Sequence, residues 1–155
     1  MAINANKSCS MRVGQRFDVT CRSITSLPGV QIPWVDKMRY LGVFIVQSRL
    51  FKCSLDNAKK AFYRCANAVF GKIGRIASEE VTLEITRCKC IPVLLYGTEA
   101  CLLNKSDSSS LDFVINRLFM KLFKTNNVEI VELCQYQFGF ENQAYYGRNV
   151  SVHLM

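Results

Sequence analysis

The side chains in this sequence whose type and spacing suit a chemical task are cations gathered in its first half. Residues 1–75 contain 13 Lys or Arg and 3 Asp or Glu, a balance of +10, whereas residues 76–155 contain 7 and 9, a balance of −2. Such asymmetry indicates a polyanionic partner for the first half, either nucleic acid or an anionic surface. A solvated basic face without a partner has the same composition, so composition leaves both interpretations open.

One group of cations falls on a predicted helix. Apolar residues recur at steps of three and four between residues 55 and 73, which predicts an amphipathic helix that Ser54 caps and that ends at Gly71 or Gly74. Lysines and arginines on consecutive turns of its other face can contact phosphates without reading base sequence. The candidate nucleic-acid-binding residues of this face are Lys59, Lys60, Arg64, Lys72 and Arg75.

A second group lies in residues 33–43. This segment is interpreted as a strand, a polar turn that contains Asp36, Lys37 and Arg39, and a second strand that runs on to residue 46. Gly42 stands among bulky strand residues, which indicates either close approach of another backbone or a bulge that bends a hairpin. Trp34, next to Pro33, is expected in the core. The candidate binding residues here are Arg39, Tyr40, Leu41 and Gly42.

The elements that must position these side chains follow from periodicity. Residues 1–50 contain short segments typical of antiparallel strands. Further helices are predicted from Ser78, with a kink or end at Pro92, from the serines at 108–110 to the asparagines at 126–127, and for a short stretch after Val128. The order predicts an α+β fold with three parts: strands in 1–50, a small helical bundle in 51–127, and a short helix with a divergent tail in 128–155.

Eight cysteines are present, and several of them fall at apolar positions of predicted helices, which favours free thiols in an intracellular, nuclear or cytoplasmic protein that is not secreted. No metal site is expected, because Cys88-x-Cys90 lacks the spacing of a zinc knuckle and the only histidine is His153. The apolar stretches are far shorter than the roughly 20 residues that span a bilayer, so no membrane partner is expected.

The order of several motifs resembles the C-terminal palm and thumb of non-LTR (LINE-type) reverse transcriptases. The motifs are Asn4-x-x-Lys7-Ser8-x-x-Met11, Trp34-Val35-x-x-Met38-Arg39-Tyr40-Leu41-Gly42, Lys59-Lys60-x-Phe62-Tyr63-Arg64, Phe70-Gly71-Lys72-Ile73-Gly74-Arg75, Pro92-Val93-Leu94-Leu95-Tyr96-Gly97 and Leu103-Asn104-Lys105-Ser106. The resemblance implies strands at the end of the palm, a primer-grip hairpin around residues 39–42 and thumb helices that hold a primer–template duplex. It also implies that Lys7, within an intact polymerase, protonates the departing pyrophosphate; a solvated strand residue is the alternative.

The chain departs from this family in two ways. No hairpin with paired aspartates (Tyr/Phe-Ala-Asp-Asp) is present, and residues 141–155 match no part of the pattern. The expectation is therefore a truncated, catalytically inactive remnant of an RNA-directed DNA polymerase that binds primer–template nucleic acid non-specifically. Its parent's palm and fingers would be missing, and Mg²⁺ would be a cofactor only of the intact parent. The alternatives are a host-recruited protein-interaction module and an inert relic without function.

Overall fold

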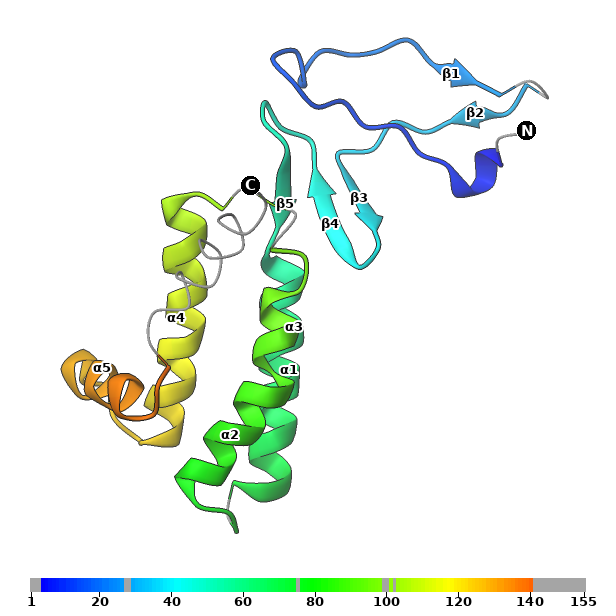
Figure 1. Ribbon diagram of the computed structural model, residues 1–155. Coiled ribbons are helices and arrows are strands. Elements are labelled where there is room, and N and C mark those ends of the chain that lie inside the picture. Colours follow the sequence, from blue (N-terminus) through cyan, green and yellow to red (C-terminus); the bar gives the residue numbers. More distant parts are fainter. Residues whose placement is uncertain (1–3, 27–28, 75, 99–100, 102, 141–155) are drawn as a thin grey trace, which may run out of the picture. The chain divides into compact units, whose positions relative to one another are not determined.

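The chain has an α+β fold that divides into two compact units, Met1–Ser54 and Leu55–Met155. The computed structural model describes residues 4–26, 29–74, 76–98, 101 and 103–140 (Figure 1). The first unit contains the strands and the second contains the helices. The boundary between the units lies at the start of the first long helix. It is four residues beyond the predicted boundary, which followed residue 50. The predicted divergent tail, residues 141–155, lies outside the described residues.

The first unit is built from a short 3-10 turn and two small antiparallel sheets. Its elements are η1 (Ala5–Lys7), β1 (Ile24–Thr25), β2 (Gln31–Ile32), β3 (Lys37–Tyr40), β4 (Val43–Val46) and β5 (Lys52–Ser54). Strands β1 and β2 pair with each other, and β3, β4 and β5 form a sheet in that order (Figure 1). The aromatic and β-branched residues of β3 and β4 account for the preference of this segment for extended backbone.

The hairpin of β3 and β4 differs from the prediction. Lys37 and Arg39 lie within a strand rather than in a polar turn, and the turn consists of Leu41 and Gly42. Both turn residues have positive φ, 46° and 86°. A two-residue turn with two positive φ angles has the right twist to join antiparallel strands, and glycine adopts it without strain. Gly42 is therefore a turn residue, not a bulge within a strand.

Two other expectations for the first unit are wrong. Trp34 is 40% exposed rather than in the core, because its indole N–H donates to the carbonyl oxygen of Arg22 at 3.0 Å and holds the ring at the surface. Lys7 ends a 3-10 turn rather than lying in a strand. Ser10 makes only an isolated parallel bridge, to Trp34, where a short strand was expected.

The second unit contains α1 (Asp56–Ile73), α2 (Glu79–Lys89), α3 (Ile91–Leu95), α4 (Lys105–Leu122) and α5 (Val128–Gln137). The predicted cap at Ser78 is confirmed, since its hydroxyl accepts from the amide of Val81. Gly74 is confirmed as the C-cap of α1. Ser54, by contrast, is the last residue of β5, and α1 begins after Leu55 without a side-chain cap.

The start of α4 was predicted wrongly. The helix begins at Lys105, three residues before the serines at 108–110, because Asn104 and Asp107 form a reciprocal capping box that satisfies the backbone amides of both residues. Asn127 caps the start of α5 rather than closing α4, since its side chain accepts from the amide of Glu129. Pro92 lies in the first turn of the short helix α3, where its missing amide proton is tolerated.

The core of the helical unit lies where α1, α2, α3 and α4 meet. Phe62, Leu94, Val114 and Phe119 are among its most buried side chains. The predicted apolar face of α4 supplies a large share of it, and Val131 is the buried residue of α5. The packing of Phe119 against Phe123 and Phe140 extends the core toward the end of α5.

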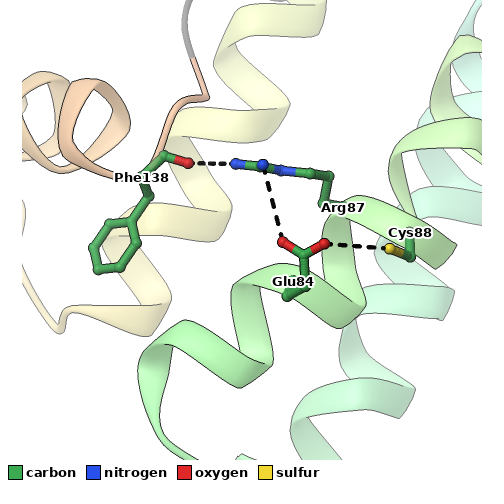
Figure 2. A network of polar contacts seen from close by, with 4 residues as sticks. All are labelled: Glu84, Arg87, Cys88 and Phe138. Atoms are coloured by element: carbon green, nitrogen blue, oxygen red, sulfur yellow. Dashed lines mark hydrogen bonds and ion pairs between the residues drawn. The ribbon is translucent and has the colours of Figure 1, made fainter.

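Arg87 links α2 to the end of α5. Its guanidinium donates to the carbonyl oxygen of Phe138 and lies 3.9 Å from a carboxylate oxygen of Glu84, whose other oxygen contacts the thiol of Cys88 (Figure 2). The same guanidinium lies 4.6 Å from the centre of the Phe140 ring. This one side chain therefore satisfies a terminal carbonyl of α5 and covers an aromatic ring of the core.

The cysteines are of two kinds, free thiols and disulfide-bonded residues. Cys9, Cys21, Cys65, Cys88, Cys90 and Cys134 are free. Cys53 and Cys101 are disulfide-bonded, so the expectation of free thiols does not hold for these two, because pairing depends on Cβ distances that sequence separation does not reveal. None of the helices within the described ranges combines the length and the hydropathy needed to cross a membrane.

Candidate nucleic-acid interface

The tip of the β3–β4 hairpin exposes the residues that the sequence singled out. Tyr40 is 63% exposed and Leu41 is 73% exposed, and Gly42 completes the turn between them and Val43. Leucine seldom adopts a positive φ, since its Cβ approaches the carbonyl oxygen, at an expense of about 1–2 kcal/mol. A strained, apolar residue held at the tip of a two-residue turn is a surface suited to contact another molecule.

Helix α1 carries the second set of candidates on the side opposite its core. Phe62 and Ala66 are buried, while Lys60 and Arg64 are exposed one turn apart, about 6 Å along the helix axis. Asp56 at the first position is the only carboxylate of this helix, and it stands where the helix dipole favours a negative charge. Asp56 lies one turn before Lys60, so Lys60 and Arg64 form a cationic row with a single carboxylate at its N-terminal end.

Lys59 does not belong to this row. It is half-buried, and its ammonium donates to the hydroxyl of Ser110 in α4. Lys59 and Lys60 are adjacent in the sequence, yet the rotation of about 100° per residue turns Lys59 toward the neighbouring helix. The prediction that Lys59 faces nucleic acid is corrected: its geometry is that of a contact between helices.

Lys121 of α4 lies against α1 and is the third cation near Lys60 and Arg64. Its ammonium donates to the side-chain oxygen of Asn67 at 2.8 Å and lies 4.9 Å from the centre of the Phe70 ring. Asn67 is three residues beyond Arg64, so the two are neighbours on the helix surface. Lys121 is exposed and therefore extends the row formed by Lys60 and Arg64. We call Lys60, Arg64 and Lys121 the α1 row.

Sequence reasoning missed Lys121 as a binding residue because it stood near the end of a different helix, where a lysine also stabilises the helix dipole. Lys72 is exposed in the last turn of α1, eight residues beyond Arg64. Arg75 lies outside the described residues. The hairpin tip and the α1 row belong to different compact units.

Two further features bear on chemistry: Lys7, the candidate catalytic residue, and the side chains that could bind a metal ion. Lys7 is exposed at the end of η1, and its backbone amide donates to the carbonyl oxygen of Asn4. Within the described ranges, no group of three or more His, Cys, Asp or Glu side chains is placed to hold a metal ion. The candidate binding features are therefore the cations of the α1 row, which can contact phosphates, and the exposed turn between β3 and β4.

Cys90 and Cys65 form a close pair of thiols in the helical unit. Cys90 is fully buried between α2 and α3, and its sulfur lies 3.1 Å from that of Cys65 in α1. Burial, with a smaller contribution from Cys65, raises the pKa of Cys90 to about 12. A thiol with such a pKa stays protonated at neutral pH and is a poor nucleophile, so Cys90 is a packing residue.

Searches for a matching family model, a similar curated protein or a similar solved structure found no match to this chain.

Proposed function

We propose that this chain binds double-stranded nucleic acid without sequence preference, through the α1 row of its helical unit. The observation that carries the proposal is the α1 row itself, in which the exposed Lys60 and Arg64 of α1 and Lys121 of α4 present their charges from two helices. Cations spaced along a helix contact phosphates and position a duplex, but do not read its bases.

The resemblance to the palm and thumb of non-LTR reverse transcriptases supports the same proposal. In that family the thumb helices hold the primer–template duplex and the grip hairpin holds the primer terminus. Tyr40, Leu41 and Gly42, and Lys60 and Arg64, occupy the corresponding motifs in this sequence. The proposed activity is binding alone, in the nucleus or cytoplasm, because the sequence has no hairpin with the paired aspartates that hold Mg²⁺ in such polymerases.

The test is a salt titration of duplex binding. Fluorescence anisotropy of a labelled RNA–DNA duplex, measured from low to high salt, should give a linear fall of log K with log salt. Each phosphate contact on a duplex contributes about 0.9 to the slope. Lys60→Gln together with Arg64→Gln should therefore reduce the slope by about two.

The matched control is Lys89→Gln together with Lys105→Gln. Both lysines are exposed, lie in the same unit and remove the same charge, but neither belongs to the α1 row. The control should keep the slope of the unmodified chain. A flat salt dependence, or an equal loss of slope in the two double variants, would rule out the α1 row as the binding surface.

A second candidate function is protein interaction through α5. This helix exposes Val128, Ile130, Leu133 and Tyr136 while it buries Val131, so its outer surface is unusually apolar. If this surface carries the function, Leu133→Asp should abolish capture of the partner, and Lys60→Gln with Arg64→Gln should leave it unchanged. If Lys60→Gln with Arg64→Gln abolishes binding and Leu133→Asp leaves it unchanged, nucleic-acid binding is favoured instead.

A further inference from the structure

The register of the three-stranded sheet gathers cations that the sequence pattern left apart. Residues directly opposite one another in antiparallel strands have their side chains on the same face. Lys37 is opposite Val46, which is opposite Lys52; Arg39 is opposite Phe44, which is opposite Ser54. One face of this sheet therefore carries Lys37, Arg39, Phe44, Val46, Lys52 and Ser54.

The polar and aromatic contacts agree with this register. The ammonium of Lys37 lies 5.0 Å from the centre of the Phe44 ring, and the guanidinium carbon of Arg39 lies 5.8 Å from it. Lys37 also donates to the hydroxyl of Ser54 at 3.3 Å across the sheet. The Phe44 ring thus lies at the centre of the face, with the cations of β3 held beside it.

The charged side chains of this face are all positive. Lys37, Arg39 and Lys52 are all exposed, and the strands β3, β4 and β5 contain no carboxylate. Residues 1–54 as a whole contain eight Lys or Arg and two Asp or Glu, a balance of +6. Lys37 and Arg39 of β3 and Lys52 of β5 lie on the two outer strands, about 10 Å apart across the uncharged β4, so their charges combine into a positive potential over this face.

We propose that this surface, which we call the basic sheet face, binds a single strand of nucleic acid. Lys37, Arg39 and Lys52 would contact its phosphates, and the Arg39 guanidinium and Phe44 ring would stack with a base. Residues two apart on a strand are about 6.6 Å apart, so Lys37 and Arg39 reach separate phosphates. A positively charged surface with an aromatic ring at its centre suits an unpaired strand, since stacking on the ring needs a base that is free of its partner.

This inference rests on the proposed function in so far as both concern nucleic acid. It adds a second surface, in the other compact unit, and a single strand in place of a duplex as the ligand. Lys37 and Lys52 have no part in the α1 row or the hairpin tip, so variants of these two lysines test the basic sheet face by itself.

The experiment compares two probes on the full chain: an oligo(dT) strand of about 15 nucleotides, within the usual site size of single-strand binding modules, and a duplex of the same length. Lys37→Gln together with Lys52→Gln should weaken oligo(dT) binding on the order of tenfold at 0.1 M salt and leave duplex binding within about twofold. Arg16→Gln together with Arg22→Gln is the control, since both arginines are exposed in the same unit and remove the same charge.

A second measurement uses the unmodified chain. Oligo(dT) should protect Lys37 and Lys52 from an amine-acylating reagent, as read by mass spectrometry, while Lys89 and Lys105 keep their reactivity. Unchanged oligo(dT) affinity in the Lys37/Lys52 variant, an equal loss in the Arg16/Arg22 control, or full reactivity of Lys37 and Lys52 would each overturn the inference. Loss of duplex binding in the Lys60/Arg64 variant tests the proposed function separately.

Discussion

Lys59 of α1 donates a hydrogen bond to Ser110 of α4, while its neighbour Lys60 points to solvent. This contact decides which of two adjacent lysines is available to a ligand. Lys59 has its ammonium committed between two helices of the core, whereas Lys60 stands in the α1 row. The two residues provide a matched pair in which the same substitution has different consequences.

Lys59→Gln is therefore expected to act on stability and Lys60→Gln on binding. The loss of a half-buried, charged hydrogen bond should lower the free energy of unfolding by about 1.5–3 kcal/mol, and duplex affinity should change little. Lys60→Gln should leave the unfolding free energy within about 0.5 kcal/mol and weaken duplex binding. Urea denaturation and fluorescence anisotropy of both variants measure the two effects. If Lys59→Gln weakens binding as much as Lys60→Gln does at equal stability, the assignment of Lys59 is wrong.

Leu41 gives a prediction in which stability and binding move in opposite directions. At φ 46°, leucine is strained, while asparagine followed by glycine is the favoured pair for such a turn. Leu41→Asn should raise the free energy of unfolding by about 0.5–1 kcal/mol, since the strain of a bulky side chain is relieved. If the exposed Leu41 side chain contacts a duplex, the affinity falls in the same variant. Denaturant melts and anisotropy decide both points; a loss of stability would contradict the strain argument.

Arg87 is expected to stabilise the helical unit through Phe138 and Phe140. Arg87→Ala removes the donor to the Phe138 carbonyl (Figure 2). It also removes the cation beside the Phe140 ring. The free energy of unfolding should fall by about 1.5–3 kcal/mol. Lys89→Ala on the same helix, two residues away and exposed, is the control and should change it by less than about 0.5 kcal/mol. Equal effects of the two substitutions in a urea titration would show that the contact is not stabilising.

The Cys90 thiol makes stability depend on alkaline pH. Its pKa is about 12 in the folded chain, against an ordinary value of 9.0, so it stays protonated after the unfolded chain has lost the proton. The stabilising effect is complete below pH 9 and is lost as the pH rises toward 12. Between these values the free energy of unfolding should fall more steeply in the unmodified chain than in Cys90→Ala. Denaturant titrations at several pH values compare the slopes, and identical slopes would contradict the assignment.

Local signals in the sequence were sufficient for much of the helical unit. The capping serine at Ser78, the end of α1 at Gly74 and the apolar face of α4 depend on neighbours three or four residues away, and all are present. The start of α4 was missed because a serine run resembles a cap, while the reciprocal bonds of Asn104 and Asp107 start the helix three residues before that run.

Binding residues were harder to identify than helices. The periodicity placed Lys59 among the cations of α1, but its bond to Ser110 joins residues 51 positions apart. Lys121 reaches Asn67 across 54 positions, and no local pattern indicated that contact. Trp34 was assigned to the core by its type, yet its indole N–H is satisfied at the surface by Arg22.

The sequence by itself determined the α+β order of elements, the amphipathic helices and the excess of positive charge in the first half, because each depends on residue type and on spacing within one or two turns. Only the tertiary structure decided which cations share a surface. Strand register placed Lys37, Arg39 and Lys52 around Phe44, and helix packing exchanged Lys59 for Lys121 in the α1 row. The physical reason is that register and packing depend on how whole elements bury their apolar faces, which brings together residues that are distant in the chain.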